Sequence, residues 1–136
     1  MTNQQRNKRI HIIATGGTIA GVGEHGATGG YASGVLPIEE LLHGLPGMHQ
    51  LAEVTGEQYA SLNSDDITQA IWLELAKHIN RLAGSDAYDG FVITHGTDTL
   101  EESAYFFHLA LKTEKPVVLT GAMRPATATS PDGPLN

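Results

Sequence analysis

The sequence predicts an α/β fold, with a doubly wound, mostly parallel sheet flanked by helices. Three short apolar runs rich in isoleucine and valine, bounded by glycine or proline, predict buried strands: residues 10–14, 90–94 and 116–120. Runs that are nearly continuously apolar are typical of strands covered on both faces. Helical patterns separate these runs, and strands that alternate with helices favour a right-handed layered α/β structure.

The longest helix is predicted from an apolar stripe at helical spacing, formed by Ile67, Ile71, Leu75, Ile79 and Leu82. Ser64 or Asp65 is available to cap this helix. A weaker strand is expected between residues 52 and 62, where the alternation of apolar residues is poor.

Two more helices are expected. One covers residues 99–112, because Thr99 and Glu102 have the spacing of a capping box, in which each side chain satisfies an unpaired backbone donor. A shorter helix is expected after Pro37, with two glutamates in its first turn.

Composition narrows the function classes. At 136 residues the chain has the size of one domain, and its 40% hydrophobic and 17% charged residues are ordinary for a globular protein. A formal charge of −7 with few cations makes a nucleic-acid partner unexpected, because phosphate binding needs clustered lysine and arginine. The absence of cysteine excludes disulfides, thiolate metal sites and cysteine nucleophiles.

The domain boundaries are expected at a polar tail, residues 1–9, followed by one α/β domain, residues 10–136. The apolar run that begins at Ile10 is far too short for an export signal or a membrane span. We therefore expect a cytoplasmic protein without a membrane partner, with the periplasm as the alternative if an export signal has been removed.

Polar, glycine-rich segments follow each expected strand, and they are expected to converge. They are residues 15–18, 63–66, 95–99 and 121–124. In open parallel sheets, ligands bind beyond the carboxyl ends of the strands, so these segments are candidates for one pocket.

The first of these segments, Thr15-Gly16-Gly17-Thr18, has three interpretations. Its glycines allow a tight turn and a close approach of the backbone to a ligand, but a structural turn with capping threonines fits the spacing equally well. A phosphate-binding loop is the weaker option, because the Gly-Lys-Ser/Thr ending and the dinucleotide-binding spacing are both missing. Thr97 and Asp98, at the start of a helix, are likewise either caps or members of a site.

The stretches IIATGGTIA, at residues 12–20, and GFVITHGTDTL, at residues 90–100, closely resemble the two signature motifs of bacterial-type asparaginases and glutaminases. Further matching residues occur in the family's order at 56–58, 121–125 and 132–134. The resemblance spans nearly the whole chain from Ile10, and it implies the larger amino-terminal domain of that family.

The resemblance also implies roles for individual residues. Thr18 corresponds to the nucleophile, and Tyr31, in a glycine-rich lid over residues 21–34, to the group that helps to activate it. Thr97 corresponds to a second threonine that the family pairs with a lysine further along the chain. Asp98 corresponds to the carboxylate that holds the substrate's α-ammonium, and Ser64 to the residue that binds its α-carboxylate.

Three other residues are expected to contact the substrate. Gly17 lies in the first loop, and Ala122 is expected to offer a backbone contact to the substrate amide. Asp65 is a departure from the family pattern, because exported members typically carry a longer side chain there, which bears on selectivity. His95 is expected to orient its loop through the imidazole, while Trp72 is expected to serve packing.

The implied reaction is hydrolysis of L-asparagine to L-aspartate and ammonia, with L-glutamine as a secondary substrate, in a homo-oligomer. No cofactor is implied, and the spacing of the histidines gives no metal-binding pattern. The resemblance further implies a truncated chain, since the family's lysine and its smaller second domain lie beyond residue 136. A non-catalytic amino-acid-binding or structural module of the same ancestry, and a nucleotide-binding module, are the alternatives.

Overall fold

The strands of the chain form a four-stranded parallel sheet in the order β2-β1-β3-β4. The computed structural model describes residues 6–23, 30–45 and 47–136. The strands are β1 (Lys8–Gly16), β2 (Ala52–Leu62), β3 (Gly90–Thr94) and β4 (Val117–Thr120). The helices are α1 (Ile38–His43), α2 (Met48–Leu51), α3 (Gln69–Ala83) and α4 (Leu100–Ala110), and 3-10 turns occupy Thr18–Ala20, Ser64–Asp66 and Gly133–Leu135.

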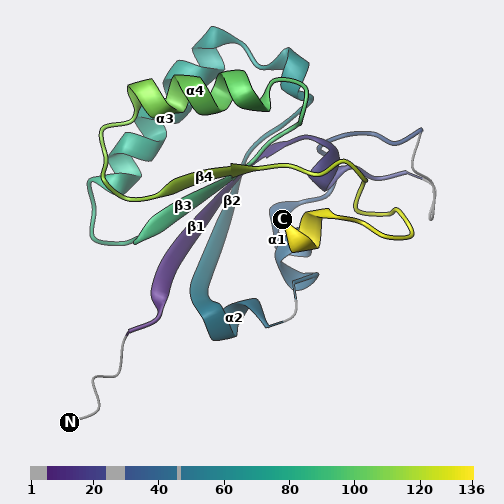
Figure 1. Cartoon of the computed structure of the whole chain (residues 1–136), viewed down its shortest axis with the longest axis horizontal. Helices are drawn as coiled ribbons and strands as arrows, with labels where there is room; N and C mark the ends of the chain where they lie inside the picture. The colour runs from purple at the N-terminus through teal and green to yellow at the C-terminus, as the bar shows by residue number, and fades with distance from the viewer. Residues whose placement is uncertain (1–5, 24–29, 46) are drawn as a thin grey trace.

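Helices cover both faces of the sheet, which confirms the predicted fold class. Helices α3 and α4 lie together over one face, while α1 and the C-terminal segment lie on the other (Figure 1). Because successive strand residues point to opposite faces, Ile13 and Ile93 pack under α3 and α4, whereas Ile12 packs against Ile38 of α1. The chain leaves β1 and β3 in opposite directions along the sheet, so the switch point of this doubly wound sheet lies between these two strands.

The expectation that every strand is covered on both faces holds for β1 but is wrong for β4. Six consecutive residues of β1, from His11 to Gly16, are buried. In β4, Val117 and Leu119 pack into the α3/α4 core, but Val118 is 53% exposed. Val118 is exposed because β4 is the edge strand of the sheet. Helix α1 packs over β1 and β2 instead, against Ile12, Ala14 and Val54.

The three predicted helices correspond to α1, α3 and α4, but α2 was not predicted and α3 begins at Gln69, after the predicted stripe residue Ile67. The predicted caps of α3 and α4 are wrong. Thr68, rather than Ser64 or Asp65, caps α3 by accepting a hydrogen bond from the amide of Ile71. The capping box at α4 does not form, because the hydroxyl of Thr99 donates to the carbonyl of Ser64 at 2.8 Å. In both cases the local pattern is overridden by the loop that precedes α3.

The weak strand predicted over residues 52–62 is a regular eleven-residue strand, β2, in parallel register with β1. Its register shifts near the end, where Ala14 pairs with Gln58 but Gly16 pairs with Leu62. This bulge re-aims the end of β2 toward the loop that follows β1.

Candidate active site

The loops that follow the four strands meet at the carboxyl edge of the sheet, at the switch point. The amide of Gly17, after β1, donates to the carbonyl of Leu62 at the end of β2 at 2.9 Å. The amide of His95, after β3, donates to Thr120 of β4 at 2.8 Å, and the hydroxyl of Thr15 donates to the carbonyl of Thr94 at 2.8 Å. Hydrogen bonds therefore link all four strand ends into one platform.

The two motif loops touch through glycine backbones. Gly17 has a φ of 80°, in the region that favours glycine, and a Cβ there would lie 2.5 Å from the Cα of Gly96. No other residue can occupy this position without moving one of the loops. The contact fixes the spacing between Thr18 on the first loop and Thr97 on the second.

Thr18 and Tyr31 form a close pair of hydroxyl groups at this edge. Their hydroxyl oxygens are 2.7 Å apart, so one hydroxyl donates to the other. The two residues come from separate segments, since Thr18 begins the 3-10 turn after β1 and Tyr31 lies beyond the glycine-rich stretch. Part of the expected lid, residues 24–29, lies outside the described residues.

The base of this segment is anchored on both sides of Tyr31. Val22 and Ala32 exchange two backbone hydrogen bonds, at 2.9 and 2.8 Å, and so form an antiparallel bridge. The segment is also tied to residues 126–127, because the carbonyl of Gly21 accepts from the amide of Ala126 at 3.0 Å. The hydroxyl of Thr127 accepts from the amide of Gly23, a contact that no sequence pattern predicts.

Ser64 links the loop after β2 to the loop after β3. Its side chain is buried, and its hydroxyl accepts from the backbone amide of Asp98 at 3.2 Å. A serine hydroxyl carries one proton, which this contact does not use. The carboxylate of Asp98 is exposed beside it, and Asp65 is exposed in the Ser64–Asp66 turn.

Thr97 and Ala122 lie on adjoining loops. A Cβ at Gly121 would lie 3.2 Å from the Cγ2 of Thr97, so the loop after β4 runs directly past this threonine. Ala122, the next residue, is buried. The structure thus brings Gly17, Ser64, Thr97, Asp98 and Ala122 to the edge that carries the pair of Thr18 and Tyr31, while Asp65 stands on its exposed side.

Asp132 holds the loop after β4. Its two carboxylate oxygens accept from the amides of Met123 and Arg124, at 2.9 and 2.8 Å. These hydrogen bonds, that of Met123 first, lower the pKa of Asp132 below its ordinary value. Sequence reasoning noted Asp132 only as part of a matching motif, because nothing in the sequence joins it to amides eight and nine residues earlier.

His95 is buried under the second motif loop, in keeping with the prediction that it orients this loop. Its Nδ1 donates to the carbonyl of Gly96 at 2.7 Å, and its Nε2 lies 2.8 Å from the hydroxyl of Ser103. Burial lowers its pKa. Trp72 stacks on Phe106, as expected of a packing residue, but its indole N–H also donates to Ser103, a residue that sequence reasoning missed.

The described residues contain neither a metal-binding cluster nor a membrane-spanning helix. Within residues 6–23, 30–45 and 47–136, no group of three or more histidine, aspartate or glutamate side chains could hold a metal ion. Over the same ranges, no helix combines the length and the apolar character needed to cross a bilayer.

Comparison with known proteins identifies the ancestry. The sequence pattern of the family described as "Asparaginase, N-terminal" matches residues 9–136. The chain belongs to the asparaginase family. This confirms the resemblance that the two motif loops suggested, and the geometry described above is therefore that of an asparaginase-family chain.

Individual relatives agree with the assignment. The chain is 54% identical to a probable periplasmic L-asparaginase of Haemophilus influenzae, over 93% of the chain and 36% of the relative. It is 49% identical to a glutaminase-asparaginase of Pseudomonas aeruginosa, over 98% of the chain and 37% of the relative. A crystal structure of a probable cytoplasmic L-asparaginase from Campylobacter jejuni superimposes with a TM-score of 0.91 at 52% identity, covering 95% of this chain and 39% of that one.

The asparaginase-family chain spans little more than a third of the length of the curated relatives it matches. The names of the relatives place one in the periplasm and another in the cytoplasm. Family membership and fold follow from these matches.

Proposed function

We propose that this chain carries the nucleophilic half of an L-asparaginase site, which hydrolyses L-asparagine to L-aspartate and ammonia with Thr18 as nucleophile. The observation that carries the proposal is the 2.7 Å contact between the hydroxyls of Thr18 and Tyr31 at the switch point of the sheet. A threonine hydroxyl is a weak nucleophile unless a neighbouring group handles its proton. Tyr31 is the group whose hydroxyl contacts that of Thr18.

The reaction proceeds by an ester intermediate. The Oγ of Thr18 attacks the side-chain amide carbon of the substrate, and the hydroxyl proton leaves through Tyr31. The carbon–nitrogen bond breaks as the amide nitrogen takes up a proton and departs as ammonia. Water then attacks the ester, which releases L-aspartate and returns a proton to Thr18.

Ser64 and Asp98 hold the amino-acid end of the substrate. The unused proton of the Ser64 hydroxyl is available to an α-carboxylate, and the Asp98 carboxylate beside it offers a charge partner for an α-ammonium. Holding both groups fixes the direction of the side chain, which brings the amide to Thr18.

The remaining residues surround the amide. Thr97 serves as the second threonine, and backbone groups of Gly17 and of Ala122 stabilise the oxygen that becomes negatively charged. Asp65, on the exposed side, bears on the choice between asparagine and glutamine. Glutaminase activity as a secondary reaction is supported by the relatives named glutaminase-asparaginase. Assembly into a homo-oligomer and a cytoplasmic location stay predictions.

The test is ammonia release from L-asparagine by the purified protein and its Thr18→Ala variant. Thr113→Ala is a matched control, because Thr113 lies between α4 and β4, near the opposite edge of the sheet. We expect ammonia release by the wild type and by Thr113→Ala but not by Thr18→Ala. Equal release by Thr18→Ala would remove Thr18 as nucleophile.

Calorimetric titration with L-aspartate separates the alternative of a non-catalytic binding module. Such a module binds L-aspartate through Ser64 and Asp98 and releases no ammonia in any variant. Stabilisation by nucleotides instead of amino acids would favour the nucleotide-binding alternative.

A further inference from the structure

A chain of buried hydrogen bonds runs from α3 through α4 to the second motif loop. The indole nitrogen of Trp72 donates to the hydroxyl of Ser103 at 2.7 Å, and the hydroxyl of Ser103 lies 2.8 Å from the Nε2 of His95. The Nδ1 of His95 continues the chain to the carbonyl of Gly96 at 2.7 Å. Ser103 and His95 are both buried, with 0% and 1% of their surface exposed.

The donor and acceptor groups allow only one direction for the hydrogen bonds of this chain. The Gly96 carbonyl can only accept, so the proton of the imidazole lies on Nδ1. Burial disfavours the charged imidazolium, which leaves Nε2 as an acceptor. The Ser103 hydroxyl must then donate to Nε2, and its oxygen is free to accept from the indole N–H of Trp72, which is a donor only.

The chain of hydrogen bonds ends at Gly96, where the backbone is tightly packed. A Cβ at Gly96 would lie 2.6 Å from the hydroxyl oxygen of Ser64, and Gly17 approaches Gly96 from the other side. The peptide of Gly96 is therefore wedged between the loops that follow β1 and β2. Thr97 and Asp98 follow it directly in the chain.

We propose that Trp72 and Ser103 are positioning residues for the reaction: through Nε2 they fix the orientation of His95, which holds the Gly96 carbonyl and so sets the place of Thr97 against Thr18. Asp98 has an independent anchor, because its amide is bonded to Ser64. The hydrogen-bond chain therefore acts on Thr97 more than on Asp98. The part of the proposal that concerns catalysis rests on the function proposed above.

Three variants test this chain in the purified protein. Ser103→Ala removes the donor to His95, Ser103→Thr restores a hydroxyl, and Trp72→Phe keeps an aromatic ring against Phe106 but removes the indole N–H. Ile79→Val, in the same core and on the same helix as Trp72, loses packing contacts but removes none of these hydrogen bonds. It serves as the control for stability.

The kinetic expectation follows from the geometry. Misplacement of a reacting group by an ångström costs up to about 100-fold in rate, so Ser103→Ala should lower kcat for L-asparagine by roughly 10-fold or more. KM should change less than kcat, because Asp98 keeps its anchor. Trp72→Phe should have a smaller effect in the same direction, Ser103→Thr should restore kcat, and Ile79→Val should leave kcat unchanged.

The nitrogen chemical shifts of His95 give a readout that a packing role would not move. The wild type should show a protonated Nδ1 and an Nε2 that accepts a hydrogen bond, whereas in Ser103→Ala the Nε2 shift should move to that of a nitrogen without a hydrogen bond. Unchanged shifts in Ser103→Ala, or an equal loss of kcat in Ile79→Val, would overturn the proposal. If the wild type releases no ammonia, the proposed function fails, and the shifts alone still decide whether the hydrogen-bond chain exists.

Discussion

The phenol of Tyr31 lies 2.7 Å from the hydroxyl of Thr18, across a separation of thirteen residues. The contact depends on the bridge between Val22 and Ala32, which turns the chain back toward β1. Tyr31 reaches Thr18 from the described end of the segment expected to be a lid.

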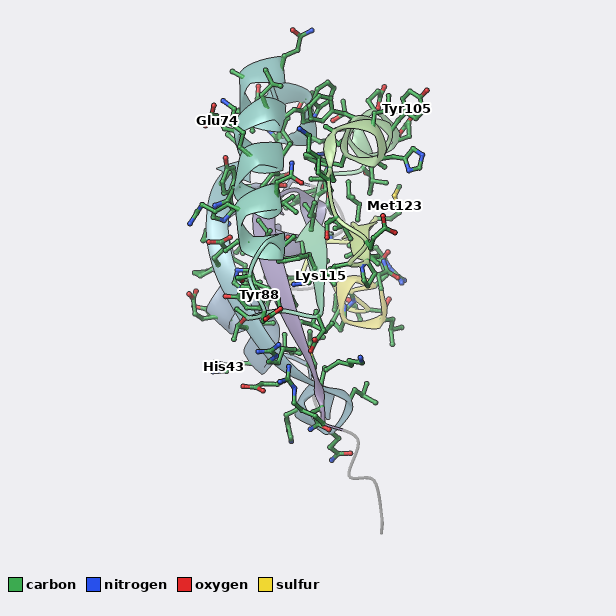
Figure 2. The ribbon with its side chains drawn as sticks, turned by 90° about the vertical axis from the view of Figure 1, so that its left-hand side faces the viewer. His43, Glu74, Tyr88, Tyr105, Lys115 and Met123 are labelled. Carbon is green, nitrogen blue, oxygen red and sulfur yellow. The ribbon has the colours of Figure 1, made fainter. Side chains whose placement is uncertain are left out.

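Tyr31→Phe should abolish proton handling at Thr18 while keeping the ring. General acid–base groups contribute about 100-fold or more to rate, so kcat for L-asparagine should fall by about that factor with a small change in KM. Steady-state kinetics measure this, with Tyr105→Phe as control, since Tyr105 is 67% exposed on the outer side of α4 (Figure 2). A kcat within twofold of wild type in Tyr31→Phe would remove Tyr31 from the reaction.

Gly17→Ala should destabilise the protein by more than its backbone angle alone requires. The angle costs about 1–2 kcal/mol for an L-residue, and the added Cβ also collides with Gly96. Gly47→Ala is the control for a positive φ alone, because Gly47 has a φ of 81° and a Cβ added there would meet no atom within 4 Å. Urea unfolding of both variants should show the larger loss for Gly17→Ala, and equal losses would mean that the two loops separate without cost.

Asp132→Asn should loosen the loop that carries Ala122, because an amide cannot accept at both atoms from Met123 and Arg124. The pKa of Asp132 is lowered in the folded state, so its contribution to stability is present above the ordinary value of 3.8 and is lost as pH falls through the lowered value. The difference in unfolding free energy between wild type and Asp132→Asn should therefore shrink on acidification. A difference that is constant down to pH values below the ordinary pKa would contradict this.

His95 should make the protein sensitive to mild acid. Burial lowers its pKa from the ordinary 6.5, so the unfolded chain takes up the proton first as pH falls. Stability is complete above that value and should decline below it, by up to about 1.4 kcal/mol per pH unit from this group. Chemical unfolding between pH 7 and pH 5 checks this against His95→Gln, which lacks the titrating imidazole and should show a shallower decline; parallel curves would argue against it.

Local sequence patterns were sufficient to predict the layered fold and the ancestry. Apolar runs of five residues indicate β1, β3 and β4, and the stripe from Ile67 to Leu82 indicates α3, because burial on a strand or a helix imposes a local period that a single segment displays. The placement of Thr18, Ser64 and Thr97 after strands was equally predictable, since the carboxyl ends of parallel strands share one edge.

The partner that each polar group takes emerged only from the folded arrangement. Thr99 had the spacing of a cap but bonds to Ser64, Trp72 was expected to serve packing but also donates to Ser103, and Val118 was expected to be buried but is exposed at the sheet edge. Each outcome depends on residues 31 or more positions apart, or on the order of strands in the sheet. Local patterns carry no record of such distances, because a hydrogen bond is decided by which groups the folded chain brings within reach.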